Sequence, residues 1–305
     1  MAAQNAIEID GLTKRYGAVT ALDDVSFRVG RGELFGLIGP DGAGKTTLFR
    51  LLTTLLVPDA GTATVDGYDI VRDYRRIRER AGYMPGRFSL YPDLSVGENL
   101  DFFAALFGVG VRDNYDLIAP IYRQIEPFRT RRAGKLSGGM KQKLALCCAL
   151  IHRPSVLFLD EPTTGVDAVS RSEFWDMLSE LKSKGISILV STPYMDEARR
   201  CDRIALCNEG RVLGIDTPQG IVGTFGEQLY ALSGDNMYGL LAEARRTPGV
   251  RECYPFGEAH HIVAGEGFDA AQFARKLVAE GFRNVDIRPA GPGIEDVFIK
   301  LMHHE

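Results

Sequence analysis

The chain has 305 residues, of which 45% are hydrophobic and 25% charged, and its formal net charge is −4. This length allows one large domain and a smaller one. The composition is that of a soluble globular protein and excludes a disordered, collagen-like or coiled-coil class. A weakly acidic chain has no overall attraction for phosphate backbones, so we expect no nucleic acid partner.

Apolar runs are short throughout the sequence. The runs at 34–38 and 156–159 have the length of strands, far below the roughly 18 apolar residues that cross a bilayer. The segment 1–10 lacks the basic and apolar blocks of a secretory signal, which predicts a cytoplasmic location. Five cysteines, with Cys147 and Cys148 adjacent in an apolar run, predict reduced, buried thiols rather than disulfides.

Strands and helices alternate through the first two thirds of the chain. Continuous apolar runs predict buried strands, and a period of 3.6 residues predicts helices. The expected strands are 7–12, 25–29, 34–38, 156–159, 186–190 and 203–206; the expected helices are 46–56, 94–109, 113–132, 137–150, 170–184 and 194–201. This order predicts a mostly parallel sheet, with a helical subdomain at about 94–150 inserted in it.

The pattern changes after Thr224. Strands are expected at 228–233, 250–254, 260–264 and 285–288, and helices at 237–246, 270–280 and 294–302. The order βαββαβ predicts a ferredoxin-like fold. We therefore expect a large α/β domain at 1–224 and a small α+β accessory domain at 225–305.

A glycine-rich loop follows the strand at 34–38 and fits the pattern G-x-x-x-x-G-K-[ST] at every fixed position. Such a loop points backbone N–H groups at phosphates. The predicted ATP-binding residues here are Gly39, Pro40, Asp41, Gly42, Ala43, Gly44, Lys45, Thr46 and Thr47. Lys45 would reach the β- and γ-phosphates, and Thr46 would ligate Mg²⁺. Asp41 is unexpected, because a carboxylate repels phosphate unless it faces solvent.

Two carboxylates end the apolar strand at 156–159. A P-loop enzyme holds its metal and its attacking water at this place, so we expect Asp160 to complete the Mg²⁺ shell and Glu161 to act as general base. An apolar strand that ends in Asp-Glu is weak evidence by itself. Together with the loop, it predicts a site that hydrolyses ATP.

A third motif precedes the helix that begins after Ser137. Its residues are Leu136, Ser137, Gly138, Gly139 and Met140. Ser137 and the N–H groups after it form a second anion-binding helix start, although a plain N-cap with flexible glycines would look the same. In this order along the chain, the pentapeptide resembles the signature motif of ABC-transporter ATP-binding subunits. In that family the motif contacts the γ-phosphate bound by the opposite subunit.

The resemblance covers residues 4–222 and implies an ABC cassette, which is a P-loop NTPase fold with a mixed sheet and an inserted helical subdomain. It places Tyr16 where the family stacks an aromatic ring on adenine, although Tyr16 could equally be an ordinary strand-end residue. Residues 164–167 resemble the D-loop, whose Asp167 communicates across a dimer. The family therefore implies ATP and Mg²⁺ as ligands and a second cassette, identical or different, as partner.

Two positions depart from the family's pattern. Gly86 stands where the family usually has a glutamine that helps to hold Mg²⁺ and water, and Pro193 stands where it has a histidine that senses the γ-phosphate. Neither residue offers a side-chain donor. Binding should survive, whereas the loss of one transition-state contact can cost a factor of about 10² to 10³ in rate.

The run 134–143 and the closing segment 293–298 look like those of ATP-binding subunits of ABC-2-type exporters, drug-resistance exporters among them. Such subunits dock on a separate membrane permease, which would hold this one at the inner face of the cell membrane; some exporters add a periplasmic adaptor. By this resemblance the segment 88–100 meets the permease, with Arg87, Tyr91 and Glu98 as candidates. Alternatively, its aromatic residues simply pack the helical subdomain.

Paired histidines at 260–261 and 303–304 suggest a metal at first sight. Neighbours on a strand point to opposite faces, and no cysteine pair with ligand spacing accompanies them, so we expect no metal site there. The accessory domain carries no recognisable catalytic constellation. Dimer contact or regulation is its expected role by analogy alone.

The sequence thus predicts the ATP-binding and ATP-hydrolysing motor subunit of an ABC-2-type exporter, with positioning and charge stabilisation as its chemistry. The alternative is a regulatory cassette that hydrolyses poorly at its own site and pairs with a more complete cassette, as Gly86 and Pro193 suggest. A soluble ABC protein that works on ribosomes or DNA is disfavoured, because such proteins usually have two cassettes or basic surfaces.

Overall fold

The structure, a computed structural model, describes residues 5–86 and 90–303. The chain forms two compact units, Met1–Pro218 and Gln219–Glu305. The sequence pattern places this boundary after residue 224. The last strand of the first unit ends at Asp216, and the short helix α7 (Pro218–Gly223) follows it. The boundary between the units therefore lies a few residues before the change in sequence pattern. Of the predicted permease contacts, Arg87 lies outside the described residues.

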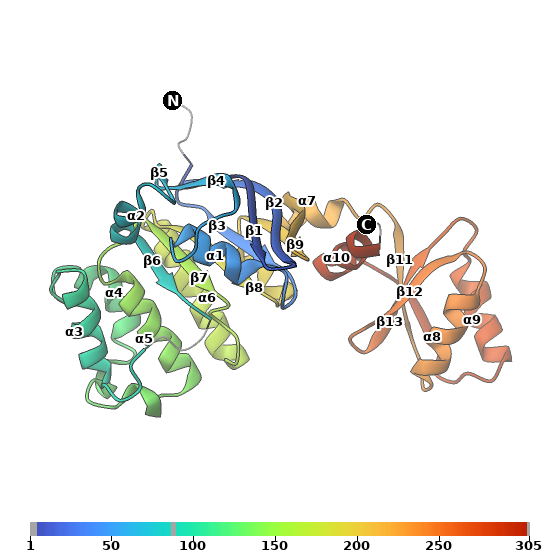
Figure 1. Cartoon of the computed structure of the whole chain (residues 1–305). Coiled ribbons are helices and arrows are strands. Elements are labelled where there is room, and N and C mark those ends of the chain that lie inside the picture. Colours follow the sequence, from blue (N-terminus) through green and yellow to red (C-terminus); the bar gives the residue numbers. More distant parts are fainter. Residues whose placement is uncertain (1–4, 87–89, 304–305) are drawn as a thin grey trace. The chain divides into compact units, whose positions relative to one another are not determined.

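One sheet of the first unit is antiparallel (Figure 1). It contains β1 (Ile7–Tyr16), β2 (Val19–Val29), β4 (Ala60–Val65) and β5 (Tyr68–Asp69), in the order β2-β1-β4-β5. Buried and exposed residues alternate along β1, as expected of a sheet with one face on the core. Strands β4 and β5 are absent from the sequence-based expectation.

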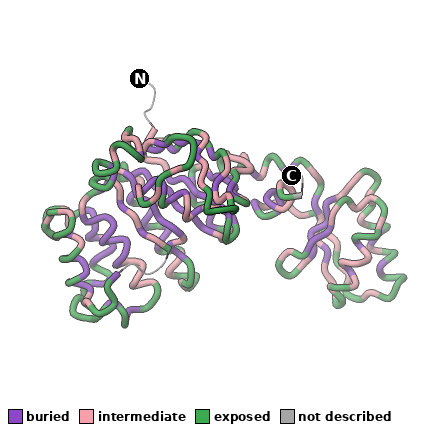
Figure 2. Tube along the Cα trace, in the orientation of Figure 1, coloured by how far each residue is buried: buried purple, intermediate pink, exposed green. Residues whose placement is uncertain are grey.

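The second sheet carries the loops of interest. Its strands are β3 (Leu34–Ile38), β6 (Ala81–Met84), β7 (Val156–Asp160), β8 (Ser187–Thr192), β9 (Arg203–Asn208) and β10 (Arg211–Asp216), in the order β10-β9-β3-β8-β7-β6. All pairs are parallel except β9 with β10. Every residue of β3, β7 and β8 is buried (Figure 2). The predicted mostly parallel sheet is confirmed, and the loops that follow β3, β7 and β8 leave the sheet at one edge.

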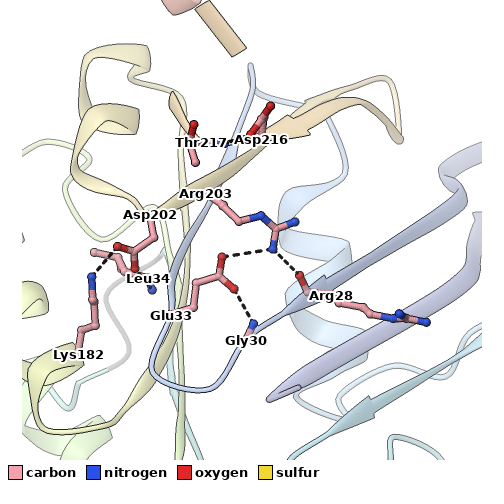
Figure 3. Close-up of polar contacts among 9 residues, drawn as sticks. All are labelled: Arg28, Gly30, Glu33, Leu34, Lys182, Asp202, Arg203, Asp216 and Thr217. Atoms are coloured by element: carbon pink, nitrogen blue, oxygen red, sulfur yellow. Dashed lines mark hydrogen bonds and ion pairs between the residues drawn. The ribbon is translucent and has the colours of Figure 1, made fainter. Parts of the chain in front are cut away.

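Polar contacts fix the amino-terminal end of β3, which is the end away from the glycine-rich loop (Figure 3). The Arg203 guanidinium lies 3.3 Å from the Glu33 carboxylate and donates to the Arg28 carbonyl, while Glu33 also accepts from the Gly30 N–H. Asp202 accepts from the Leu34 N–H at 2.9 Å and pairs with Lys182. These bonds tie β2, β3 and β9 together and fix the start of the strand that leads into the glycine-rich loop.

Helices cover the parallel sheet. They are α1 (Lys45–Leu52), α2 (Tyr74–Arg80) and α6 (Ala168–Ser183). Phe49 of α1 meets Phe158 of β7 edge-to-face at 6.0 Å, which packs α1 on the sheet. The predicted helix 194–201 is a 3-10 helix, η3 (Met195–Arg200), because Tyr194 and Cys201 are both extended and leave room for little more than one turn before β9.

The helical subdomain consists of α3 (Val96–Leu106), α4 (Tyr115–Tyr122) and α5 (Gly138–Leu150), which lie together in Figure 1. The expectation of helix up to residue 132 is wrong, because the chain beyond Tyr122 forms two short 3-10 turns. Its backbone pairs instead with the segment before α3: the Val96 N–H donates to the Arg131 carbonyl and the Ala133 N–H to the Leu94 carbonyl.

The second unit has the predicted βαββαβ order. Its elements are β11 (Gln228–Ser233), α8 (Met237–Arg246), β12 (Val250–Phe256), β13 (Ala259–Ala264), α9 (Ala270–Ala279), β14 (Asp286–Ala290) and a final helix, α10 (Ile294–His303). The antiparallel sheet has the order β12-β13-β11-β14, and the ferredoxin-like expectation is confirmed. The Asp296 carboxylate of α10 is buried and accepts from the Tyr254 hydroxyl and contacts the His261 ring, so α10 is anchored to the sheet.

The five cysteines are free and buried, as predicted. Burial raises the pKa of Cys207 to about 12, so its thiol stays protonated at neutral pH. Among the described residues, no helix has the length and apolar character that would let it cross a membrane.

Candidate functional site

The glycine-rich loop joins β3 to α1 in a conformation that requires glycine at defined places. Gly42 and Gly44 have φ of 85° and 91°, in the left-handed region. A Cβ on Gly39 would lie 2.1 Å from the Cys207 carbonyl oxygen, and one on Gly44 would lie 2.4 Å from that of Ala21. The glycines of the motif therefore serve backbone shape and close packing. Within the loop, the Gly39 N–H donates to the Thr192 carbonyl and the Ala43 N–H to the Pro40 carbonyl.

Lys45 begins α1 and is 5% exposed. Its ammonium donates to the carbonyls of Gly39 at 2.8 Å and Pro40 at 2.9 Å. It also lies 3.2 Å from the Glu161 carboxylate. A buried ammonium needs such partners, and here they position the Lys45 ammonium beside the glycine-rich loop.

A cavity of about 590 Å³ opens beside Lys45. It is lined by Ala21, Asp41, Gly42, Ala43, Gly44, Lys45, Thr46, Thr47, Arg50, Tyr83, Pro85, Gly86, Asp160 and Glu161. The structure thus brings most of the predicted ATP-binding residues and both predicted carboxylates to one cavity. A hydroxyl and a carboxylate, from Thr46 and Asp160, both line it, and this is an oxygen donor set suited to Mg²⁺.

Asp160 and Glu161 are held by one serine that sequence reasoning missed. The Ser191 hydroxyl, on β8, donates to the Asp160 carboxylate at 2.9 Å and accepts from the Glu161 N–H at 3.0 Å. Glu161 has φ of 49°, in the left-handed region that residues other than glycine seldom adopt, so the chain turns out of the strand direction here. The sequence shows Ser191 as a hydroxyl residue near the end of an apolar strand. That this strand lies next to the one carrying Asp160 depends on the strand order, which the sequence does not reveal.

Arg50 and Tyr83 are among the residues of the cavity that were not predicted. Arg50 lies on α1, five residues beyond Lys45, and Tyr83 lies on β6 beside β7. Burial, with a smaller contribution from the Asp160 charge, raises the pKa of Tyr83 to about 12. Its hydroxyl therefore remains a hydrogen-bond donor at neutral pH.

Gly86 lines the cavity against the acidic strand. A Cβ at this position would lie 3.0 Å from the Asp160 carbonyl oxygen, so any larger residue requires a small shift of the loop. The other departure, Pro193, follows β8 and is not among the described residues that line the cavity. Tyr16, at the end of β1, is 45% exposed and is likewise not among them. Its predicted stacking on adenine stays a prediction.

The signature and D-loop residues form a separate surface of the same unit. Ser137 caps α5 by accepting from the Met140 N–H, and Asp167 caps α6 by accepting from the Ser170 N–H at 3.0 Å. This second bond keeps the pKa of the Asp167 carboxyl below its usual value. A Cβ on Gly139 would lie 2.8 Å from the Ser170 hydroxyl, so the two helix starts pack tightly together. None of these residues is among those described as lining the cavity.

A second cavity of about 620 Å³ lies between the helical subdomain and the sheet. Its lining is largely apolar and includes Leu55, Leu90, Phe103, Leu106, Phe107, Cys148 and His152. Tyr83 lines both cavities. Two predicted permease residues lie at or near helix α3, which lines this cavity. Glu98 completes a capping box with Ser95 at the start of α3, and the Tyr91 ring contacts the Phe102 ring at 4.7 Å.

The described histidines of the second unit do not form a metal centre. His260 bonds the Met237 carbonyl, whereas His261 contacts Asp296, so the two rings have different partners. Across the described part of the chain, no group of three or more potential ligands could hold a metal ion.

Comparison with known proteins identifies the family. The model of the ABC transporter family matches residues 22–164. The daunorubicin resistance ATP-binding protein DrrA2 of Streptomyces coeruleorubidus is 36% identical over 315 residues, 98% of this chain and 95% of that protein. The Nod factor export ATP-binding protein I of Paraburkholderia xenovorans (strain LB400) is 36% identical, over 98% of each chain.

A probable multidrug ABC transporter ATP-binding protein, YbhF of Escherichia coli (strain K12), is 38% identical over 97% of this chain, which spans only about half (52%) of that relative's length. Among solved structures, an ATP-binding subunit of an ABC transporter is 31% identical, with a TM-score of 0.66 over 72% of this chain and 93% of that one. A dimeric bacterial ABC transporter cassette, 24% identical, has the same fold, with a TM-score of 0.63 over 69% of this chain and 98% of that one. This chain therefore belongs to the ATP-binding proteins of ABC transporters.

Proposed function

We propose that this chain binds Mg-ATP in the cavity beside Lys45 and hydrolyses it as the motor subunit of an ABC-2-type exporter. One observation carries the proposal: Lys45, Asp160 and Glu161, from the loop after β3 and the end of β7, line the same cavity. These are the cation, the metal ligand and the general base that phosphoryl transfer to water needs.

Each group has a distinct part in the reaction. The loop N–H groups and Lys45 would bind the β- and γ-phosphates, and Thr46 and Asp160 would hold Mg²⁺, which when bound neutralises phosphate charge. Phosphate oxygens would compete with Glu161 for the Lys45 ammonium, which now lies 3.2 Å from that carboxylate. Glu161, released in this way, would orient and deprotonate water.

A second cassette, identical or different, is needed to complete the site. Ser137 and Asp167 lie on a surface of their own rather than in the lining of the chain's own cavity. Their helix N-termini would suit an anion bound by a partner. The dimeric arrangement of a solved cassette of the same fold supports this part of the proposal.

The other partner would be an ABC-2-type membrane permease, to which the apolar cavity of the helical subdomain is suited. Leu106 and Leu55 are exposed at its rim, 64% and 55%, and Arg78 and Glu79 add charge there. Docking there would hold the chain on the inner face of the cell membrane. The relatives described above include a daunorubicin resistance protein and a Nod factor export protein, which agrees with an exporter, and some such systems include a periplasmic adaptor.

Gly86 and Pro193 favour a second candidate, a regulatory cassette that binds ATP but hydrolyses it weakly at its own site. The tight approach of Gly86 to the Asp160 carbonyl leaves no room for a glutamine without a shift of the loop. In this case a partner cassette would carry most of the turnover.

Phosphate release by the purified chain, alone and with its permease, separates the two candidates. Wild type is compared with Glu161→Gln and Lys45→Ala, and ATP binding is measured in parallel. A motor loses turnover about 10²-fold or more in Glu161→Gln while it still binds ATP. Turnover that Glu161→Gln leaves unchanged contradicts hydrolysis at this chain's own site.

A further inference from the structure

A buried carboxylate behind the site is used by none of the roles above. Glu197 lies on η3 and is 5% exposed. Its Oε2 accepts from the Thr192 hydroxyl at 2.6 Å and from the Thr163 hydroxyl at 3.0 Å. Both hydroxyls are themselves buried, so one carboxylate oxygen joins two chain segments inside the protein.

These two segments flank the proposed general base. Thr163 lies within the turn that begins at Glu161, where the Thr164 N–H donates to the Glu161 carbonyl, and the chain continues from there to Asp167. Thr192 ends β8 and follows Ser191, whose hydroxyl bonds both Asp160 and the Glu161 N–H. Glu197 therefore connects the loop after β7 with the loop after β8.

The two oxygens of the Glu197 carboxylate are unequally partnered. Its Oε1 is buried and has no hydrogen-bond partner among the described residues. Arg171 of α6 lies 4.0 Å from Oε1, and its guanidinium lies over the Tyr194 ring at 4.8 Å. Burying a carboxylate is costly; the two hydroxyl bonds to Oε2 offset part of that cost, whereas Oε1 has only this long ion pair.

We propose that Glu197 is a positioning residue for ATP hydrolysis, which sets the loop that carries Glu161 against the loop that carries Pro193. Pro193 has no side-chain donor with which to fix its own loop. The hydrogen bonds from Thr163 and Thr192 to Glu197, a bridge between the two loops, hold the loop that carries Pro193 instead. The Tyr194 N–H adds a bond to the Thr192 hydroxyl at 3.0 Å. Thr163 lies between Glu161 and Asp167 along the chain, and its carbonyl accepts from the Val166 N–H.

The inference rests on the proposed hydrolysis at Glu161, and the variants are chosen to separate the two. Glu197→Gln keeps the shape and an oxygen that accepts from both hydroxyls, whereas Glu197→Ala removes the bridge. Asp196→Asn is the matched control, because Asp196 is the exposed acidic neighbour on the same helix. Thr163→Val and Thr192→Val each remove one hydroxyl at nearly constant volume.

Steady-state ATPase kinetics, the Kd for ATP and the thermal midpoint are measured for each variant. We expect Glu197→Ala to lower kcat about tenfold or more with little change in Kd, as misplacement of a catalytic group does. Glu197→Gln should retain most of the turnover, and Asp196→Asn all of it. The two threonine variants should be non-additive, because their hydroxyls share one oxygen.

Hydrogen exchange provides a readout that does not need turnover. Amides at 162–167 and 192–196 should exchange faster in Glu197→Ala, and at nearly the wild-type rate in Glu197→Gln. Unchanged kcat and exchange in Glu197→Ala, or equal losses in both Glu197 variants, would overturn the inference. A wild type that does not hydrolyse ATP contradicts the proposed function instead, and the exchange comparison then still decides whether the bridge positions the loops.

Discussion

The ammonium of Lys45 lies 3.2 Å from the carboxylate of Glu161. The group expected to bind phosphate and the group expected to activate water thus face each other, and each neutralises the other within the cavity. An incoming polyphosphate therefore competes with Glu161 for the same cation. This competition has a measurable consequence for binding.

Glu161→Gln should bind ATP at least as tightly as the wild type, because it removes the carboxylate that competes for Lys45. Lys45→Met should raise the Kd at least about tenfold, a loss of about 1.4 kcal/mol. Titration calorimetry of both variants tests this. If Glu161→Gln binds ATP much more weakly than the wild type, the ion pair does not oppose phosphate binding.

Ser191→Ala should lower the ATPase turnover by more than the accompanying loss of stability explains. It removes the donor to the buried Asp160 carboxylate and one of two acceptors of the Glu161 N–H, which keeps its bond to the Ser191 carbonyl at 3.2 Å. An unsatisfied buried group costs about 1 to 3 kcal/mol. Ser187→Ala is the control: Ser187 is buried on the same strand, but its hydroxyl accepts from the Gly32 N–H at the far end.

Thermal unfolding and ATPase assays on the two serine variants give the comparison. Both should lose similar stability, whereas only Ser191→Ala should lose turnover. Equal turnover in the two variants would mean that Ser191 does not position the acidic pair.

The loop of the cavity could be predicted because its determinants are local. A fully apolar strand ending at Ile38, glycines at fixed spacing and Lys45 at the start of a helix define it within one stretch of sequence. The same holds for Asp160 and Glu161, which end another buried strand. The ferredoxin-like order of the second unit follows equally from local periodicity, since its elements are regular and closely spaced.

The remaining parts depend on tertiary packing. Arg50, Tyr83 and Ser191 reach the site only because α1 packs on β7 and because β6 and β8 flank β7. Strand β6 has only four residues, and two of them are only partly buried, so its apolar signal is weak. A parallel partner, distant in the sequence, is what makes it a strand.

Gly139→Ala should disrupt the surface formed by the signature and D-loop segments, although alanine favours helix by about 1 kcal/mol. The added methyl would lie 2.8 Å from the Ser170 hydroxyl oxygen and 3.0 Å from its Cβ. ATP-dependent dimerisation, followed by light scattering, should weaken. Adding Ser170→Gly removes both atoms and should restore dimerisation, whereas a double variant as impaired as Gly139→Ala would exclude this contact as the cause.

His152 should make the first unit acid-sensitive. Burial, only partly offset by the hydrogen bond to the Ala81 carbonyl, lowers its pKa from 6.5 to about 4. Between these values the unfolded chain takes up a proton that the folded chain does not, so the free energy of unfolding falls as the pH drops from 6.5 to 4. Above pH 6.5 this contribution is constant.

Denaturant unfolding of wild type and His152→Gln at pH 7 and pH 5 measures the effect. Glutamine does not titrate, and it loses the stacking of His152 on Phe107, whose ring centroid lies 3.7 Å away. The variant should therefore be less stable than wild type at pH 7, and the difference should shrink at pH 5, where only the wild type is penalised for burying a neutral imidazole. A difference that stays constant between the two pH values would show that His152 titrates alike in the folded and unfolded chain.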